Sequence, residues 1–388
     1  MEWGIQPTVM FVDHFPDVSM YDERQNERPI AGSSPWASAG SLNTMRIAQV
    51  AHLTESVPPK AYGGSERIIA YLTDQLVQLG HDVTLFASAD SVTKARLESV
   101  CGEAVRSPET LTERMARLML LQERIFQLSA QYDIIHAHLD FLAFPLARRS
   151  ETPVLTTVHG KLDLPELQTV YREFSDVPLI SVSDAQRLPC PWANWRATIH
   201  HGLPLDLYRL DTGGGGYLAF LGRLSPEKGP VEAIEVAKRA GLPLRIAAKV
   251  DPADTIYYQE VIKPLLADGS VEYVGELTDR EKNTFLGDAV ALVCPFRPES
   301  FGLVLIESLA CGTPVLVYNH GSFPEIIEDG ETGFLCTHVD DMVKAIGKLS
   351  SIDRARCRRS FEERFTAERM TNEYLRVYDE IVRGALTR

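Results

Sequence analysis

The sequence of 388 residues has no uninterrupted apolar run approaching the ~18 residues of a membrane-spanning helix. It also has no excess of basic residues, because 39 Lys and Arg stand against 53 Asp and Glu, a net charge of −14. Such a chain is a poor candidate for binding nucleic acid through its overall charge. The 45% of hydrophobic and 24% of charged residues are typical of a globular protein and exclude a disordered or collagen-like chain. We therefore expect a folded protein with no nucleic-acid partner.

Paired cysteine motifs are missing as well. No Cys-x-x-Cys or Cys-x-x-His pair occurs among the six cysteines, which are Cys101, Cys190, Cys294, Cys311, Cys336 and Cys357. Several lie in apolar stretches, as Cys294 does after Ala291-Leu-Val. This pattern favours buried, reduced thiols over disulfides or a metal site, and it indicates a cytoplasmic protein.

Residues 1–44 lack any sustained apolar period and are rich in Pro, Gly and Ser. No basic segment followed by an apolar one is present there, which excludes a secretory signal. At Met45 the sequence changes to Met-Arg-Ile-Ala-Gln-Val-Ala, which is typical of a buried strand. We interpret residues 1–44 as a disordered N-terminal extension, or as upstream sequence before a true start at Met45.

From residue 45 onward, short apolar runs alternate with longer segments of helical period. The helical segments include Gly64–Leu79 and Glu109–Gln131, a helix around Thr255–Ala267 and a final one at Thr366–Leu386. The expected strands are Ile47–Ala51, Val83–Ala87, Asp133–His138, Val154–Val158, Leu179–Val182, Tyr217–Leu221, Leu244–Ala248, Val271–Val274, Val290–Cys294 and Val315–Val317. Continuous apolar strands that alternate with helices imply parallel sheets covered on both faces.

The alternation weakens at 202–216, where four consecutive glycines end a segment that we interpret as an interdomain linker. We therefore predict an α/β fold of two doubly wound, Rossmann-like domains, 45–205 and 217–365, that face a cleft. The last segment, 366–388, is expected to be a helix that packs back toward the first domain. In such sheets ligands bind beyond the carboxyl ends of the strands, so the site should lie in the cleft.

Common phosphate-binding signatures are absent. The glycines at 213–216 precede a strand instead of following one, so they fail the dinucleotide pattern, and the segment 222–229 lacks the Gly-Lys-Ser/Thr of a Walker loop. No Asp-x-Asp occurs, the pair that usually holds the cation of a metal-dependent sugar-nucleotide site. If phosphates bind, fixed cations and helix ends must replace the metal, so we expect no metal site.

Candidate replacements are present. Arg223 ends a predicted strand and Lys228-Gly229 opens the next helix, so the two cations can clamp a diphosphate. The alternative is a pair of exposed charges in a turn. Further along, Gly302 lies where a loop becomes a helix, and a helix start offers free N–H groups to an anion. Glu299 and Glu307, eight positions apart, have the acceptor oxygens that hold sugar hydroxyls, although Glu307 alone would be a solvated helix residue.

With these segments, Tyr62-Gly63-Gly64-Ser65-Glu66, His159-Gly160 and Pro324–Phe334, the chain resembles the retaining glycosyltransferases of family 4, which have the GT-B fold. The resemblance covers residues 45–388. It implies transfer of a sugar from a nucleoside diphosphate sugar, UDP- or GDP-linked, to a hydroxyl acceptor such as a cell-envelope or polysaccharide precursor. It implies a metal-independent displacement on the same face, with no cofactor besides the donor. The first domain would bind the acceptor and the second the nucleotide sugar.

The resemblance also assigns roles. Arg223 and Lys228 would stabilise the leaving diphosphate, Glu299 would bind the donor sugar, and His159 would reach that sugar from the first domain. The remaining nucleotide-sugar contacts would be Gly63, Gly64, Gly302, Leu303, Glu307 and, beside the base, Val274. His138 and Ser183 are the candidate acceptor contacts.

For several motifs a purely structural role stands beside the functional one. Ser322–Glu325 has the form of a capping box. His136-Ala-His138 with Asp140 resembles a metal cluster, but its position at a strand end favours residues that face the cleft over a metal site. Trp192 and Trp195 favour packing over stacking on a sugar. The helix 109–131, with Arg114, Arg117 and Arg124 beside apolar residues, favours packing on its own sheet over peripheral membrane contact.

Two other functions fit this reading less well. One is a different GT-B enzyme, a sugar-nucleotide epimerase or a much longer phosphorylase. The other is a catalytically idle protein that only binds a sugar nucleotide, against which the intact set of polar residues argues.

Overall fold

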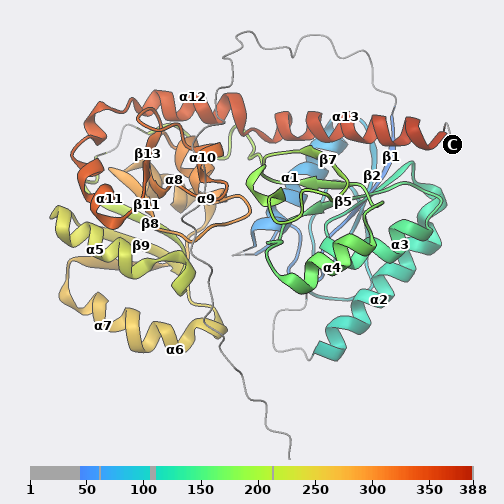
Figure 1. Cartoon of the computed structure of the whole chain (residues 1–388), viewed down its shortest axis with the longest axis horizontal. Helices are drawn as coiled ribbons and strands as arrows, with labels where there is room; N and C mark the ends of the chain where they lie inside the picture. The colour runs from blue at the N-terminus through green and yellow to red at the C-terminus, as the bar shows by residue number, and fades with distance from the viewer. Residues whose placement is uncertain (1–43, 61–62, 105–110, 212–213, 387–388) are drawn as a thin grey trace, which may run out of the picture. The chain divides into compact units, whose positions relative to one another are not determined.

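Two parallel sheets organise the computed structural model, which describes residues 44–386 apart from 61–62, 105–110 and 212–213. The predicted extension therefore lies, but for Thr44, outside the described residues. Each sheet is wound outward in both directions from its first strand, with helices on both faces (Figure 1). The prediction of two doubly wound α/β domains is thus confirmed.

The first sheet has the strand order β3-β2-β1-β4-β5-β6-β7, and every neighbouring pair is parallel. Its strands are β1 (Arg46–Val50), β2 (Asp82–Phe86), β3 (Arg96–Glu98), β4 (Ile134–Ala137), β5 (Val154–Val158), β6 (Leu179–Ser181) and β7 (Trp195–Thr198). Its helices are α1 (Gly64–Gln78), α2 (Leu111–Leu128), α3 (Phe144–Arg149) and α4 (Pro165–Glu173). We call this part the first domain.

The second sheet has the order β10-β9-β8-β11-β12-β13, again all parallel. Its strands are β8 (Leu218–Arg223), β9 (Leu244–Lys249), β10 (Val271–Gly275), β11 (Ala291–Cys294), β12 (Val315–Tyr318) and β13 (Gly333–Cys336). Its helices are α5 (Pro230–Ala240), α6 (Thr255–Tyr257), α7 (Lys263–Leu265), α8 (Asp279–Gly287), α9 (Leu303–Ala310), α10 (Phe323–Ile326), α11 (Val339–Ile346) and α12 (Arg354–Arg364). We call this part the second domain.

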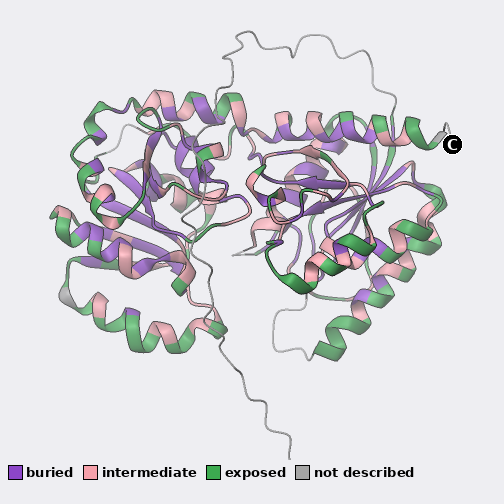
Figure 2. Cartoon of the chain, viewed as in Figure 1, coloured by how far each residue is buried: buried purple, intermediate pink, exposed green. Residues whose placement is uncertain are grey.

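The inner strands of both sheets are mostly buried, as Figure 2 shows. β4, β5 and β11 contain no exposed residue, which explains why their continuous apolar runs could be recognised. The three strands that were not predicted are edge strands with half-buried residues: β3 and β7 of the first sheet and β13 of the second. Such strands lack the apolar run on which the prediction depends.

The segment expected as one helix at Thr255–Ala267 is irregular. A π-helical turn, Tyr258–Ile262, separates α6 from α7, and Pro264 stands second in α7. Proline lacks the N–H that a regular helix would use there, so the hydrogen-bond pattern shifts. The predicted helix 109–131 is α2 followed by a 3₁₀ turn at Ser129–Gln131.

The chain crosses between the domains twice, at neighbouring points. Leu203 on the way out forms a parallel bridge with Thr366 on the way back. A side chain on Gly202 would overlap with the carbonyl of Thr366, so only glycine allows this approach. The last helix, α13 (Ala367–Leu386), then packs against α1 of the first domain (Figure 1).

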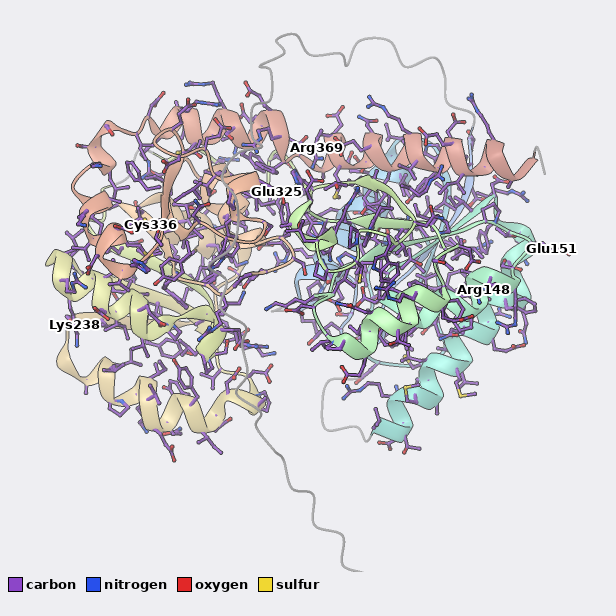
Figure 3. All side chains as sticks on the ribbon, viewed as in Figure 1. Arg148, Glu151, Lys238, Glu325, Cys336 and Arg369 are labelled. Atoms are coloured by element: carbon purple, nitrogen blue, oxygen red, sulfur yellow. The ribbon has the colours of Figure 1, made fainter. Side chains whose placement is uncertain are left out.

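Glu325 of α10 holds this junction together. Its carboxylate accepts hydrogen bonds from the backbone N–H groups of Asp184 (2.9 Å) and Ala185 (2.8 Å), and its Oε2 lies 2.9 Å from Nε2 of His200. Arg369 of α13 donates to the carbonyl of His200 at 2.5 Å. Glu325 and Arg369 accordingly lie close together in Figure 3.

None of the described helices has both the length and the apolar composition that crossing a bilayer requires.

Candidate functional site

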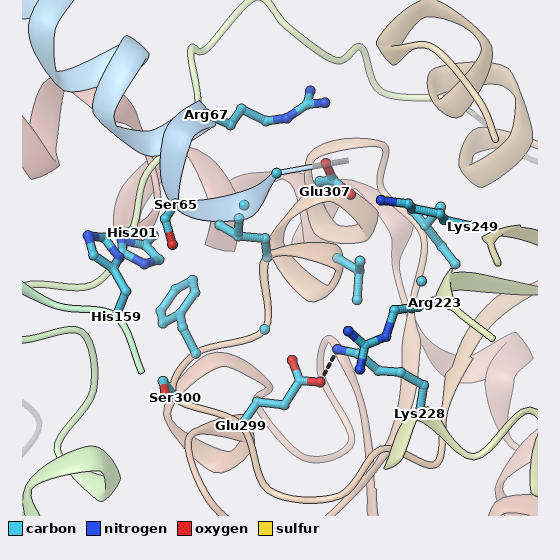
Figure 4. Close-up of a pocket in the computed structure, with 18 of the residues that line it drawn as sticks. Ser65, Arg67, His159, His201, Arg223, Lys228, Lys249, Glu299, Ser300 and Glu307 are labelled. Atoms are coloured by element: carbon cyan, nitrogen blue, oxygen red, sulfur yellow. Dashed lines mark hydrogen bonds and ion pairs between the residues drawn. The ribbon is translucent and has the colours of Figure 1, made fainter. Parts of the chain in front are cut away.

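A pocket of about 930 Å³ is lined by residues of both domains. His159 directly follows β5, Arg223 and Lys249 end β8 and β9, and Glu299 lies in the loop after β11. The pocket therefore lies beyond the carboxyl ends of the strands in both sheets, where ligands bind in such folds. In Figure 4, His159 and His201 face the cations Arg223, Lys228 and Lys249 across it.

Arg223 and Lys228 meet in this pocket, as the clamp hypothesis requires. Arg223 forms ion pairs with Glu227 and, at 3.1 Å, with Asp254. Lys228 forms an ion pair with Glu299, and its ammonium group lies 4.6 Å from the centre of the Phe296 ring. The Lys228 side chain is only 15% exposed, so water screens its charge weakly.

Gly229 makes the position of Lys228 possible. Its φ of 62° is left-handed, and a side chain there would overlap with the carbonyl of Pro295. Lys228 thus ends a short 3₁₀ turn, Pro226–Lys228, and α5 begins only at Pro230. The prediction that Lys228-Gly229 opens the helix is therefore wrong by a small margin, because the helix starts at Pro230, two residues after Lys228.

Glu307 is buried, so it is not the solvated helix residue that it would be in isolation. Its side chain is 4% exposed, and its Oε1 accepts from Lys282 Nζ at 2.9 Å and lies 3.1 Å from the hydroxyl of Tyr208. The same hydroxyl lies 3.2 Å from Asp279 of α8. Burial beside these two carboxylates raises the pKa of Tyr208 well above its ordinary value.

Arg67 of α1 completes this group from the other domain. It lines the pocket and forms an ion pair with Asp279 that joins the first domain to the second. Four residues of this group were not predicted from the sequence: Arg67, Tyr208, Asp279 and Lys282. Only the position of Arg67, one turn after Gly63-Gly64, could have pointed to it, because the others follow no motif.

The start of α9 also faces the pocket. Gly302 precedes the helix with a φ of 111°, and Leu303 and Val304 line the cavity. A side chain on Gly64 would come within 3.1 Å of Leu303, so the first turns of α1 and α9 nearly touch. Free N–H groups at such helix starts attract anions.

A hydrogen-bonded group of histidines forms the first-domain wall. His159 Nε2 lies 2.9 Å from His138 Nδ1, and His138 Nε2 lies 2.9 Å from Gln49 Oε1. The ring of His159 also stacks on that of His201, with centroids 5.4 Å apart. Burial lowers the pKa of His159 to about 4 and holds those of His138 and His201 well below their ordinary value.

Three predicted contacts do not line the pocket. His138 is fully buried behind His159, and Ser183 is buried with its hydroxyl donating to the carbonyl of Ser300 at 2.7 Å. Both therefore support pocket residues and are not placed to touch an acceptor. Val274 is half-buried in the core, whereas Glu276 and Leu277 after it line the pocket.

The structure bears on the structural interpretations of Ser322–Glu325, the two tryptophans and the His136–Asp140 group. Ser322 precedes α10 but its side chain makes no capping hydrogen bond, because its hydroxyl is shared between the carbonyls of Glu299 (3.1 Å) and Phe301 (2.5 Å) and so holds the loop of Glu299. Trp195 donates to the carbonyl of Cys190 at 2.9 Å, and Trp192 stacks under Arg172. Within the described residues, no group of three potential metal ligands comes together, at His136–Asp140 or elsewhere.

Two family models match the chain. Residues 62–201 match the Glycosyltransferase Family 4 model, and residues 212–364 match that of the Glycosyl transferases group 1. The first match falls in the first domain and the second in the second domain, and both domains line the pocket. The chain is a glycosyltransferase of the GT-B fold.

Named relatives agree with this assignment. The glycosyltransferase is 26% identical over 351 residues to the glycogen synthase of Mycobacterium tuberculosis, covering 76% of this chain and 84% of that protein. It is 31% identical over 132 residues to the N-acetyl-alpha-D-glucosaminyl L-malate synthase of Bacillus anthracis. That match covers 32% of this chain and only about a third (34%) of the relative.

Solved structures share the fold of this glycosyltransferase. Sucrose-phosphate synthase from Thermosynechococcus elongatus superposes with a TM-score of 0.74 at 18% identity, over 88% of this chain and all (100%) of that one. HepE of Anabaena, in complex with UDP and glucose, gives 0.67 at 19% identity, over 86% and 99% of the two chains.

Proposed function

We propose that this glycosyltransferase moves a sugar from a UDP- or GDP-linked donor to a hydroxyl acceptor, with retention of the anomeric configuration and without a metal ion. One observation carries the proposal: two cations, a helix start and two glutamates converge in one pocket between the domains. Arg223 and Lys228 supply the cations, α9 the free N–H groups, and Glu299 and Glu307 the carboxylates. The UDP bound by HepE supports a uridine donor.

The diphosphate would take the place that the internal ion pairs now occupy. Lys228 is held by Glu299, and Arg223 by Glu227 and Asp254, so each cation is oriented before the donor arrives. Charge grows on the leaving phosphate as the glycosidic bond breaks, and fixed cations therefore stabilise the transition state more than the bound donor. In this proposal these cations take over the role of a metal.

Retention would follow from displacement on one face. The bond between the anomeric carbon and the phosphate oxygen loosens, the acceptor hydroxyl attacks from the same side, and the leaving phosphate accepts its proton. Glu299 would then hold donor hydroxyls and not act as a nucleophile, which fits its ion pair with Lys228. His159 would approach the same sugar from the first domain.

Glu307, with Gly63, Gly64, Gly302 and Leu303, would contact the nucleotide part of the donor. The ribose hydroxyls fit Glu307 best, because its carboxylate is buried and held at Oε1 by Lys282. The base would lie near Lys249, Glu276 and Leu277.

The cellular role belongs to the proposal as well. We expect a cytoplasmic enzyme that acts on a cell-envelope or polysaccharide precursor and contacts the membrane peripherally through α2. That helix buries Leu118, Leu121 and Ile125 on its own domain. It exposes a second apolar set: Leu111 (72%), Met115 (42%), Met119 (69%) and Leu120 (58%).

The test is release of nucleoside diphosphate from a panel of UDP-, GDP- and ADP-sugars, with and without hydroxyl acceptors. A glycosyltransferase releases the diphosphate faster when an acceptor is added. An epimerase interconverts the donor sugar with no acceptor, and an idle binding protein turns over nothing. Either of the last two results would contradict the proposal.

A further inference from the structure

Two cations of the pocket differ from the others. Seven Lys and Arg side chains among the described residues line the pocket, and five of them form an ion pair with a carboxylate: Arg67, Arg223, Lys228, Lys249 and Lys282. The other two are Lys161 and Arg297. Both residues are exposed, and neither side chain forms an ion pair with a carboxylate of the described residues. Their charges are therefore available to an anion that enters the pocket.

The two residues come from opposite domains. Lys161 follows β5 of the first domain, two residues after His159, and Arg297 follows β11 of the second domain, two residues before Glu299. In Figure 4, His159 lies on the opposite side of the pocket from Lys249, with Glu299 between them. Both cations thus stand beside residues proposed to hold the donor sugar, which is also where the acceptor must arrive.

Hydrogen bonds connect the loops that carry the two cations. Gln186 donates to the carbonyl of Gly160 at 2.8 Å, and its own backbone N–H donates to the hydroxyl of Ser183 at 3.1 Å. That hydroxyl donates in turn to the carbonyl of Ser300 at 2.7 Å, across the domain interface. Gly160 directly precedes one cation, and Ser300 lies three residues after the other. The two cations therefore extend from backbone segments that are fixed to each other.

His320, two residues after β12, lies near both charges. Burial lowers the pKa of His320, and the positive charges of Lys161 and Arg297 lower it further. Its loop packs on that of Arg297, because a side chain on Gly321 would come within 3.2 Å of Pro298. Exposed charges act over about 8–10 Å in salt solution, so both cations lie within about that distance of one ring. A small anion between them would relieve their mutual repulsion.

We propose that Lys161 and Arg297 form a second anion site in the pocket, which binds a phosphate or carboxylate group of the acceptor. That the anion belongs to the acceptor rests on the proposed function, whereas the anion site itself does not. The ligand class is thus an acceptor that carries a negatively charged group beside the hydroxyl to which the sugar is transferred.

The donor is a poorer source of this anion. Its diphosphate would bind at Arg223 and Lys228, and a diphosphate that takes Lys228 leaves the carboxylate of Glu299 without its cation. A carboxylate on the donor sugar would then face a second carboxylate and be repelled. Lys161 belongs to the first domain, which is the acceptor side in the proposed function, so the acceptor is the substrate that meets both free cations.

The anion site is tested with inorganic phosphate, which replaces chloride at constant ionic strength in a solution of the full chain. The probe is the ring of His320, observed by NMR of histidine-labelled protein and assigned from a His320→Gln variant. We expect phosphate to raise the pKa of His320, because a bound anion offsets the two positive charges. In Lys161→Met/Arg297→Met the pKa of His320 should already be raised, and phosphate should change it no further.

Lys344→Met/Lys348→Met is the matched control, because it removes two exposed positive charges of the second domain that do not line the pocket. This control should respond to phosphate as the wild type does. A pKa of His320 that phosphate leaves unchanged in the wild type, or changes equally in Lys161→Met/Arg297→Met, would overturn the proposal.

The identity of the anion's carrier is tested by diphosphate release with matched acceptors: glucose, glucose 6-phosphate and glucuronate, and glycerol with glycerol 3-phosphate. We expect the anionic member of a set to be preferred about tenfold in kcat/KM, the order of one hydrogen bond to a charged group. Lys161→Met and Arg297→Met should each reduce this preference by raising the KM for the anionic acceptor.

Two results would refute the assignment to the acceptor. One is a neutral acceptor used as well as its anionic counterparts, and the other is a preference that both variants retain. If no sugar nucleotide reacts with any acceptor, the proposed function fails, while the phosphate titration still decides whether Lys161 and Arg297 form an anion site.

Discussion

Lys228 offers the sharpest test of the proposed clamp. The Lys228→Met variant keeps most of the volume of the side chain and removes its charge. The side chain is 15% exposed and its ammonium group lies over the Phe296 ring, so a phosphate there would meet a largely desolvated cation. Loss of one preorganised group that stabilises transition-state charge costs about 2.7–4 kcal/mol, or roughly 10²–10³-fold in kcat. We expect a loss of that order.

Part of this loss would come from Glu299, which the substitution leaves without its cation. The double variant Lys228→Met/Glu299→Gln separates the two contributions in a mutant cycle. The assay is release of nucleoside diphosphate at saturating donor and acceptor. Lys344→Met is the matched control, because this lysine of the same domain is 74% exposed and its nearest acid, Asp341, lies 3.8 Å away. A kcat for Lys228→Met within about threefold of the wild type would refute the clamp, given the magnitude above.

Four further outcomes are expected. NMR of the product should show the anomeric configuration of the donor, and an inverted product would contradict the retaining mechanism. Gly202→Ala should lower the free energy of unfolding by about 1–3 kcal/mol, because the new methyl group overlaps with the Thr366 carbonyl. Gly384→Ala, in the open part of α13, should raise the free energy of unfolding by about 0.5–1 kcal/mol. Urea titrations of both variants check these two changes. The free energy of unfolding should be highest above pH 6.5 and fall between pH 6.5 and 4. The cause is that His159 has a pKa of about 4 in the folded protein, so the unfolded chain takes up the proton first as the pH falls. A free energy of unfolding that stays constant in urea titrations across this range would exclude this effect of His159. Met119→Ser/Leu120→Ser should weaken pelleting with vesicles containing anionic lipid while leaving diphosphate release from a water-soluble acceptor unchanged, and equal pelleting would rule out contact through α2.

The sequence allowed the parts of the site that depend on local pattern to be predicted. Arg223 could be placed because it ends a buried strand, and Glu299 because it lies just before a glycine that precedes a helix. In a doubly wound sheet these loops lie at the same edge, so their convergence follows from the fold.

The parts that depend on distant partners could not be predicted. Arg67 and Asp279 are 212 positions apart, Gln49 and Tyr378 are 329, and Ser183 and Ser300 are 117. No local pattern shows which of many polar residues will meet across two domains. For that reason Ser183 and His138 were correctly placed near strand ends, while their interactions with Ser300 and His159 emerged only from the structure.

The return of α13 to the first domain has a consequence for how the protein is made. Tyr374 and Tyr378 complete the hydrogen bonds of Thr157, His136 and Gln49, which precede them by more than 200 residues. A ribosome will therefore have synthesised the whole second domain before the first can acquire its last helix. Until then His136 and Gln49 lack the hydroxyl of Tyr378 and Thr157 lacks that of Tyr374, so a nascent chain arrested before residue 366 should hold its first sheet without these buried partners.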